Sequence, residues 1–160
     1  MKKLFLVIIS LMLLQGLFAG DWKKVKSDDP APAKTKLVSS DIETTVLRLE
    51  IPGFFLDEVT TPNGKEYIVS LEEATPILIE GEPDLVKLTT SVMIPDLAQM
   101  DVEVLSSEFV EFSNISVAPS KGNLTRDIDP STVPYTYGKH YNQDQFFPGP
   151  LAELRDPYII

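Results

Sequence analysis

Thirteen prolines in a chain of 160 residues constrain the fold more than any other feature of the sequence. Proline lacks a backbone N–H and clashes with the preceding turn of a helix, so it is rare in helix interiors and central strands. Between the prolines lie short runs of alternating apolar and polar residues, and no window has a clear helical periodicity. The sequence therefore predicts an all-β fold, an antiparallel, jelly-roll-like β-sandwich.

The alternating runs give five predicted strands. They lie at residues 45–51, 54–59, 65–71, 85–94 and 101–112, the last being one strand or a strand pair. In the first run, Leu47, Leu49 and Ile51 share one face, as expected of a half-buried strand. The second and third runs should form a hairpin, because Asn63 and Gly64 between them tolerate the positive φ angles of a tight turn.

The first twenty residues have the form of a secretory signal peptide. Lys2 and Lys3 precede an apolar run from residue 4 to residue 18, which is short for a membrane span of about 20 residues. We expect a signal helix that is cleaved after Ala19 or Gly20, so that no stable membrane span remains. The alternative is an uncleaved membrane anchor.

Two stretches lack regular patterning. Residues 21–40 are polar and carry five lysines, which predicts a flexible linker and places the folded domain at residues 41–160. Six prolines lie between residues 119 and 157, and four of the five tyrosines follow residue 134. This end is predicted to be an irregular Pro/Tyr-rich segment, either an ordered cover on the sandwich or a docking arm.

Composition excludes several classes of function. The formal net charge of −10 argues against a nucleic-acid partner, because phosphate binding needs clustered Lys and Arg. The absence of cysteine excludes disulfides, thiolate metal sites and a cysteine nucleophile within these residues. The protein must therefore be stabilised by an ordinary apolar core, which about 140 residues can supply.

The residues offer little catalytic chemistry. His140 is the only histidine and could act as a general base, but no Gly-x-Ser-x-Gly motif accompanies it, so a surface role is favoured. Asp127 and Asp129, or Glu72 and Glu73, could bind calcium, but neither pair belongs to an EF-hand loop, and a solvated acidic face is favoured. The sequence predicts no metal, no cofactor and no enzymatic activity of its own. A hydrolase that uses carboxylates is the least favoured of the alternatives.

Short motifs in the second half of the chain resemble a known family. They are Gly81-Glu82-Pro83-Asp84-Leu85, Val92-Met93-Ile94-Pro95, Val102-Glu103-Val104, Val117-Ala118-Pro119-Ser120-Lys121, Pro134-Tyr135, Tyr141 and Phe147-Pro148-Gly149. In order and spacing they resemble the N-terminal propeptide of gingipain-type cysteine peptidases, which are exported bacterial endopeptidases of the caspase-like clan. The resemblance covers about Val46 to Ile160. It departs at Val86, where the family often has a second proline, and the peptidase domain with its catalytic Cys and His is missing.

The resemblance implies a proenzyme module. Such a propeptide covers the cleft of a cysteine peptidase catalytic domain, inhibits it during export and assists its folding. The partner could be on the same chain or on another, in the periplasm or outside the cell. The apolar ending at residues 156–160 favours a truncated precursor over a propeptide that stands alone.

Basic residues near the end of the resemblance are the candidates for the inhibitory contact. Arg126 is the first candidate for insertion into the cleft and Lys121 the second, with an exposed loop charge as the alternative for each; Arg155 is a candidate processing site. The rival hypothesis is a free-standing secreted module that binds carbohydrate or a surface partner. Its candidate residues are Tyr135, Tyr137 and Tyr141.

Overall fold

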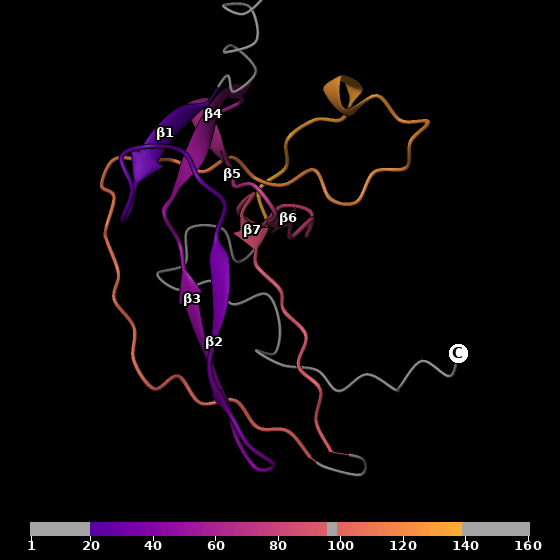
Figure 1. The fold of residues 1–160 in the computed structure, drawn as a ribbon. Coiled ribbons are helices and arrows are strands. Elements are labelled where there is room, and N and C mark those ends of the chain that lie inside the picture. The colour runs from indigo at the N-terminus through magenta and orange to yellow at the C-terminus, as the bar shows by residue number, and fades with distance from the viewer. Residues whose placement is uncertain (1–19, 96–98, 139–160) are drawn as a thin grey trace, which may run out of the picture.

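The computed structural model describes residues 20–95 and 99–138, which form antiparallel sheets with almost no helix. The elements in chain order are β1 (Asp21–Lys24), β2 (Lys34–Ser40), β3 (Thr45–Glu50), β4 (Gly53–Thr61), β5 (Gly64–Ser70), β6 (Thr75–Pro76), β7 (Val86–Lys87) and the 3-10 helix η2 (Pro130–Thr132). Figure 1 shows a sheet of β1, β4 and β5, a long β2–β3 hairpin and the small β6–β7 pair. The all-β prediction is confirmed, whereas the jelly-roll-like sandwich stays a prediction.

The predicted hairpin is confirmed as β4 and β5. Thr61 pairs with Gly64, which leaves Pro62 and Asn63 as a two-residue turn, and Gly64 has a φ of 105°. A positive φ at this position is what the turn chemistry of the sequence requires. The predicted strand at residues 45–51 is likewise confirmed as β3.

The linker prediction for residues 21–40 is wrong where β1 and β2 form. β1 pairs with β4, and the Trp22 ring lies 4.9 Å from the Phe55 ring. β2 pairs with β3 and is exposed along its whole length, so it has no apolar face that the sequence could reveal. Because each strand is stabilised by its partner, a polar composition did not exclude it.

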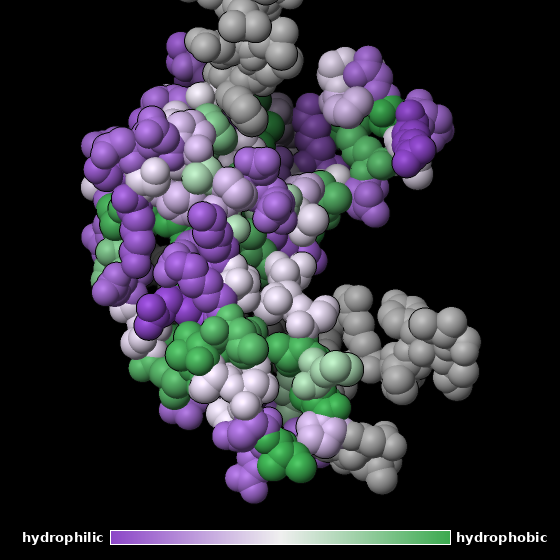
Figure 2. Space-filling model, in the orientation of Figure 1, coloured by the Kyte–Doolittle hydropathy of each residue, from purple (hydrophilic) through white to green (hydrophobic). Residues whose placement is uncertain are grey.

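The strands predicted at residues 85–94 and 101–112 are wrong for most of their length. Only Val86–Lys87 pairs, with β6, and the remaining described residues of both segments join no strand. Several of their apolar side chains are exposed, with Met93 at 98% and Phe109 at 78%. Figure 2 shows apolar atoms gathered over the end of the molecule that holds the β2–β3 hairpin. Alternation marks the faces of a potential strand, but a strand also needs a hydrogen-bonded neighbour.

The core lies on the β4–β5 sheet. Its buried apolar side chains include Phe55, Leu56, Leu71, Ala118 and Pro119. The segment 116–120 runs between β5 and residues 82–84: Ala118 N–H donates to Tyr67 O at 2.8 Å, and Ala118 O accepts from Asp84 N–H at 2.8 Å. Hydrogen bonds on both edges therefore fix the position at which the chain leaves the core after Ser120. Across the described residues, no helix has the length and apolar content needed to cross a bilayer.

Candidate functional site

A 19-residue excursion leaves the core at Ser120 and returns to it at Gly138; we call residues 120–138 the loop (Figure 1, orange). Both of its ends bind the same short segment. Ser120 N–H donates to Glu82 O at 2.7 Å, and Ser120 O accepts from Gly81 N–H at 2.9 Å. Gly138 N–H donates to Gly81 O at 2.7 Å. The loop therefore begins and ends at one point on the core.

Two glycines make this crossing of the chain possible. A Cβ on Gly81 would lie 2.8 Å from Gly138 N and 2.9 Å from Gly138 Cα, and a Cβ on Gly138 would lie 2.9 Å from Gly81 O. Gly81 also has a φ of 80°, which side-chain-bearing residues adopt only with strain. The two backbones can approach this closely only because neither residue carries a side chain.

A buried hydrogen-bond network attaches the returning limb of the loop to the sheet. Tyr137 OH donates to Oε2 of Glu66, a β5 residue that is only 2% exposed, and lies 3.1 Å from Thr61 Oγ1. Ser116 Oγ donates to Glu66 Oε1 at 2.9 Å. Burial and the hydrogen bond to Glu66 raise the pKa of Tyr137. A buried carboxylate that accepts several hydrogen bonds is a strong anchor. If one donor is lost, a carboxylate oxygen stays buried without a hydrogen bond, and the free energy cost of its desolvation is no longer offset.

Inside the loop, the outgoing and returning limbs are joined by one lysine. Lys121 Nζ donates to Pro130 O at 2.7 Å and lies 4.2 Å from the centroid of the Tyr135 ring. Pro130 begins η2, which Asp129 caps by accepting from Ser131 N–H at 2.9 Å. Hydrogen bonds from Ser131 lower the pKa of Asp129, with a smaller contribution from the charge of Lys121.

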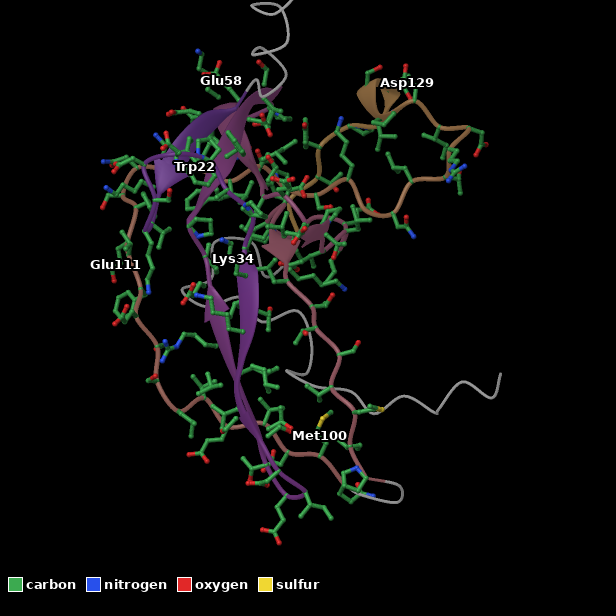
Figure 3. All side chains as sticks on the ribbon, viewed as in Figure 1. Trp22, Lys34, Glu58, Met100, Glu111 and Asp129 are labelled. Atoms are coloured by element: carbon green, nitrogen blue, oxygen red, sulfur yellow. The ribbon has the colours of Figure 1, made fainter. Side chains whose placement is uncertain are left out.

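Arg126 lies in the turn of the loop between Thr125 and Ile128, where Ile128 N–H donates to Thr125 O at 3.1 Å. Its side chain is exposed and, within the described part of the chain, makes no hydrogen bond or ion pair. Figure 3 places Asp129, three residues further on, well away from the labelled side chains of the sheets. The loop therefore presents a cation to solvent at a distance from the core.

The other predicted site residues have different surroundings. Lys121 is engaged within the loop rather than presented outward. Gly20 begins the described residues and lies against β4, since its Cβ would be 2.6 Å from Asp57 Oδ1. Ala19, Arg155, His140 and Tyr141 lie outside the described residues. Within residues 20–95 and 99–138, no three acidic or histidine side chains gather as a metal site would require, the pairs Asp127/Asp129 and Glu72/Glu73 included.

Sequence reasoning missed the anchors of the loop. The sequence analysis places Gly81 only in a family motif, although a glycine just before a proline-containing segment is a signal for a positive φ. Glu66 and Tyr137 are 71 residues apart in the chain, so no local pattern connects them. A single glutamate within an otherwise apolar-alternating strand was the one available signal.

Comparison with known proteins gives the class and the family of this chain. Residues 26–160 match the family model Propeptide_C25, so the chain belongs to that family of propeptides. The family forms the pro-regions of gingipain cysteine peptidases, and this chain is the pro-domain and not the catalytic part.

The relatives and a solved structure agree with this assignment. The chain is 39% identical over 124 residues to Gingipain R1 of Porphyromonas gingivalis, covering 78% of this chain and 12% of that protein. It is 32% identical to Gingipain R2 of the same species over all of this chain and 22% of that protein. It also matches a chain in the complex of Porphyromonas gingivalis RgpB pro- and mature domains, with a TM-score of 0.69 and 34% identity, over 79% of this chain and 66% of that chain.

Proposed function

We propose that this protein is an exported pro-domain that inhibits a gingipain-like cysteine peptidase and assists its folding. In this proposal the loop enters the substrate cleft, and Arg126 occupies the pocket that recognises a basic substrate side chain. The observation that carries the proposal is an exposed Arg126, without a partner among the described residues, on a loop whose ends are both fixed to the core. The structural relative, a pro-domain in complex with a mature domain, supports a peptidase as the partner.

The geometry favours binding for two physical reasons. A guanidinium can form two parallel hydrogen bonds with a carboxylate, and charge-assisted bonds of this kind are the strong ones. A loop that is already held in shape loses less conformational entropy on binding than a flexible peptide. If pro-domain and peptidase share a chain, the high effective concentration makes even modest affinity sufficient. Proteolysis of the tether, for which Arg155 is the candidate site, would then release the inhibitor.

The test is a titration of the purified protein against the mature peptidase domains of gingipain R2 and of a lysine-specific relative. Arg126→Ala should weaken inhibition of the gingipain R2 domain at least tenfold, or about 1.4 kcal/mol. Arg48→Ala is the matched control, because Arg48 is an exposed arginine on β3, far along the chain from the loop. Equal inhibition by the Arg126→Ala variant and the wild-type protein would remove Arg126 from the mechanism.

Export is a separate part of the proposal. The leader at residues 1–20 directs the chain to the periplasm or the outside of the cell, and it is removed after Ala19 or Gly20. N-terminal sequencing of the protein secreted by a bacterial host tests this, and a start elsewhere would contradict it.

The rival hypothesis of a carbohydrate-binding module loses support from the loop. A sugar platform needs exposed aromatic faces, but the Tyr135 ring is covered by Lys121 and the Tyr137 hydroxyl is bound to Glu66. Both tyrosines are half-buried. They act as internal contacts of the loop instead.

A further inference from the structure

Lys121 joins the parts of the loop on either side of Arg126. It lies five residues before Arg126, and its ammonium group binds Pro130 O, four residues after it, and the face of Tyr135. The Lys121–Pro130 hydrogen bond joins two residues that are nine positions apart in the sequence, one on each side of the turn that holds Arg126. A second closure exists at the base, where Ser120 and Gly138 both bind Gly81, but it spans about twice as many residues.

We propose that Lys121 is a positioning residue that keeps the loop intact when the peptidase attacks it. The inference rests on the proposed function and deepens it, because it concerns why a substrate-like loop would remain an inhibitor. A cation that enters a pocket of the peptidase must point away from the loop, whereas a cation that braces the loop must bind other parts of it. Lys121 does the second, through its contacts with Pro130 O and the Tyr135 ring.

The chemistry of a cysteine peptidase explains why bracing matters. The thiolate of the enzyme attacks the carbonyl carbon of Arg126, the Arg126–Asp127 C–N bond breaks, and the amine of Asp127 leaves with a proton from the enzyme's acid. The Arg126 carbonyl is then held as a thioester. With an ordinary substrate the amine product diffuses away, and water hydrolyses the thioester.

In the loop, the new amine cannot leave easily. Asp127 belongs to the segment that continues into η2, and this segment stays attached to the outgoing limb through the Lys121–Pro130 and Lys121–Tyr135 contacts. The amine therefore remains beside the thioester. Its nitrogen attacks the carbonyl carbon, the C–S bond breaks to return the thiolate, the amine proton passes back to the enzyme's base, and the Arg126–Asp127 peptide bond is restored. A nucleophile held in place competes with water because its effective concentration is high.

The size of the effect follows from the tether. Doubling the length of a flexible tether lowers the effective concentration of its ends about threefold. Removing the Lys121 brace leaves the closure at the base of the loop and the single Ile128–Thr125 hydrogen bond beside the cleaved peptide, so a change of about threefold is expected. The brace also restricts the orientation of the two ends, which adds to it.

The experiment compares wild type, Lys121→Met, Lys121→Arg and Tyr135→Leu, each mixed with the mature peptidase domain of gingipain R2. Two quantities are measured separately: the inhibition constant from initial rates, and the rate of cleavage at Arg126–Asp127 by mass spectrometry. Lys121→Met and Tyr135→Leu should be cleaved at least threefold faster than wild type. Lys121→Arg, which keeps the cation and the donor, should be cleaved at close to the wild-type rate.

Hydrogen exchange without the peptidase is the independent measurement. Amides of residues 122–129 should exchange faster in Lys121→Met than in wild type, whereas amides of β4 and β5 should be unchanged. Failure of wild type to inhibit, or equal inhibition by Arg126→Ala, would overturn the proposed function. Inhibition through Arg126 with no faster cleavage of Lys121→Met would overturn only the role of Lys121, as would unchanged exchange in the loop.

Discussion

Replacing Gly81 with alanine should detach the returning limb of the loop from the core. The new Cβ would lie 2.8 Å from Gly138 N and 2.9 Å from Gly138 Cα, and backbone atoms cannot rotate away as a side chain can. The residue would also keep a φ of 80°, which costs about 1–2 kcal/mol for an L-residue. Losing the 2.7 Å hydrogen bond from Gly138 N–H to Gly81 O adds about 1 kcal/mol. The loop base should therefore be weakened by about 2–3 kcal/mol.

Alanine substitutions at two other glycines distinguish the cost of a positive φ from the cost of a steric clash. Gly122 also has a φ of 80°, but the nearest atom to its Cβ would be a side-chain carbon of Glu80 at 3.1 Å. Gly64 has a φ of 105° and would have no atom within 4 Å. Alanine at Gly64 should cost only the backbone strain, of about 1–2 kcal/mol, and alanine at Gly122 slightly more. Alanine at Gly81 should exceed both.

Hydrogen exchange of the Gly138 amide is the direct assay. A loss of about 2–3 kcal/mol corresponds to a fall of roughly 30- to 150-fold in its protection, because each 1.4 kcal/mol is tenfold. Urea denaturation followed by the fluorescence of Trp22, the only tryptophan, reports the sheet separately. If Gly81→Ala and Gly122→Ala lower the protection of Gly138 equally, the close backbone crossing does not fix the limb.

Three further outcomes test the anchor, the pH dependence and the core. Tyr137→Phe should lower the free energy of unfolding by about 1.5–3 kcal/mol, since it removes a donor to the buried carboxylate of Glu66; an unchanged urea midpoint would contradict this. Burial raises the pKa of Asp84 above its unfolded value, so the folded state binds the proton more tightly and this contribution to stability falls as pH rises through the folded pKa; Asp84→Asn should remove that slope from thermal melts. Phe55→Ala should lower the free energy of unfolding by about 3–5 kcal/mol, whereas alanine at the exposed Phe109 should change it by less than about 0.5 kcal/mol. Equal losses in the two variants would contradict the assignment of Phe55 to the core.

Local signals in the sequence were sufficient for part of the fold. The β4–β5 hairpin follows from Asn63 and Gly64 between two apolar runs, because the turn and both strands lie within one short window. β3 likewise follows from its own alternation of apolar and polar residues. In these cases the information that sets the structure is close by in the chain.

Elsewhere the structure depends on partners that local patterns do not identify. β1 is short and carries two lysines, and it is a strand because β4 offers a free edge and Phe55 offers a contact for Trp22. Residues 101–112 alternate as a strand should, yet no neighbouring strand pairs with them in the described structure. Alternation records which side chains could be buried, not whether a neighbouring strand is present.

In the candidate site, too, some features depend on local sequence and others on residues that meet only in the folded chain. The exposed position of Arg126 on a loop could be expected, because it follows the Gly122-containing stretch after Pro119, and both are local features. The role of Lys121 depends on Pro130 and Tyr135, which approach it only when the loop closes. Its inward orientation was therefore not accessible from the sequence, where every lysine on a loop resembles a free charge.

In the proposed function, the anchoring of the loop links inhibition to the stability of the core. Fixing the backbone of one residue costs about 1–2 kcal/mol of entropy, so a free segment of this length would lose a large part of its binding energy on entering a cleft. Here Ser120 and Gly138 are both bound at Gly81, and Ala118 is hydrogen-bonded on both edges, so much of that entropy is lost on folding. It follows that a core substitution such as Phe55→Ala, which lies outside the loop, should weaken the proposed inhibition in proportion to the fraction of molecules whose segment 116–120 has opened.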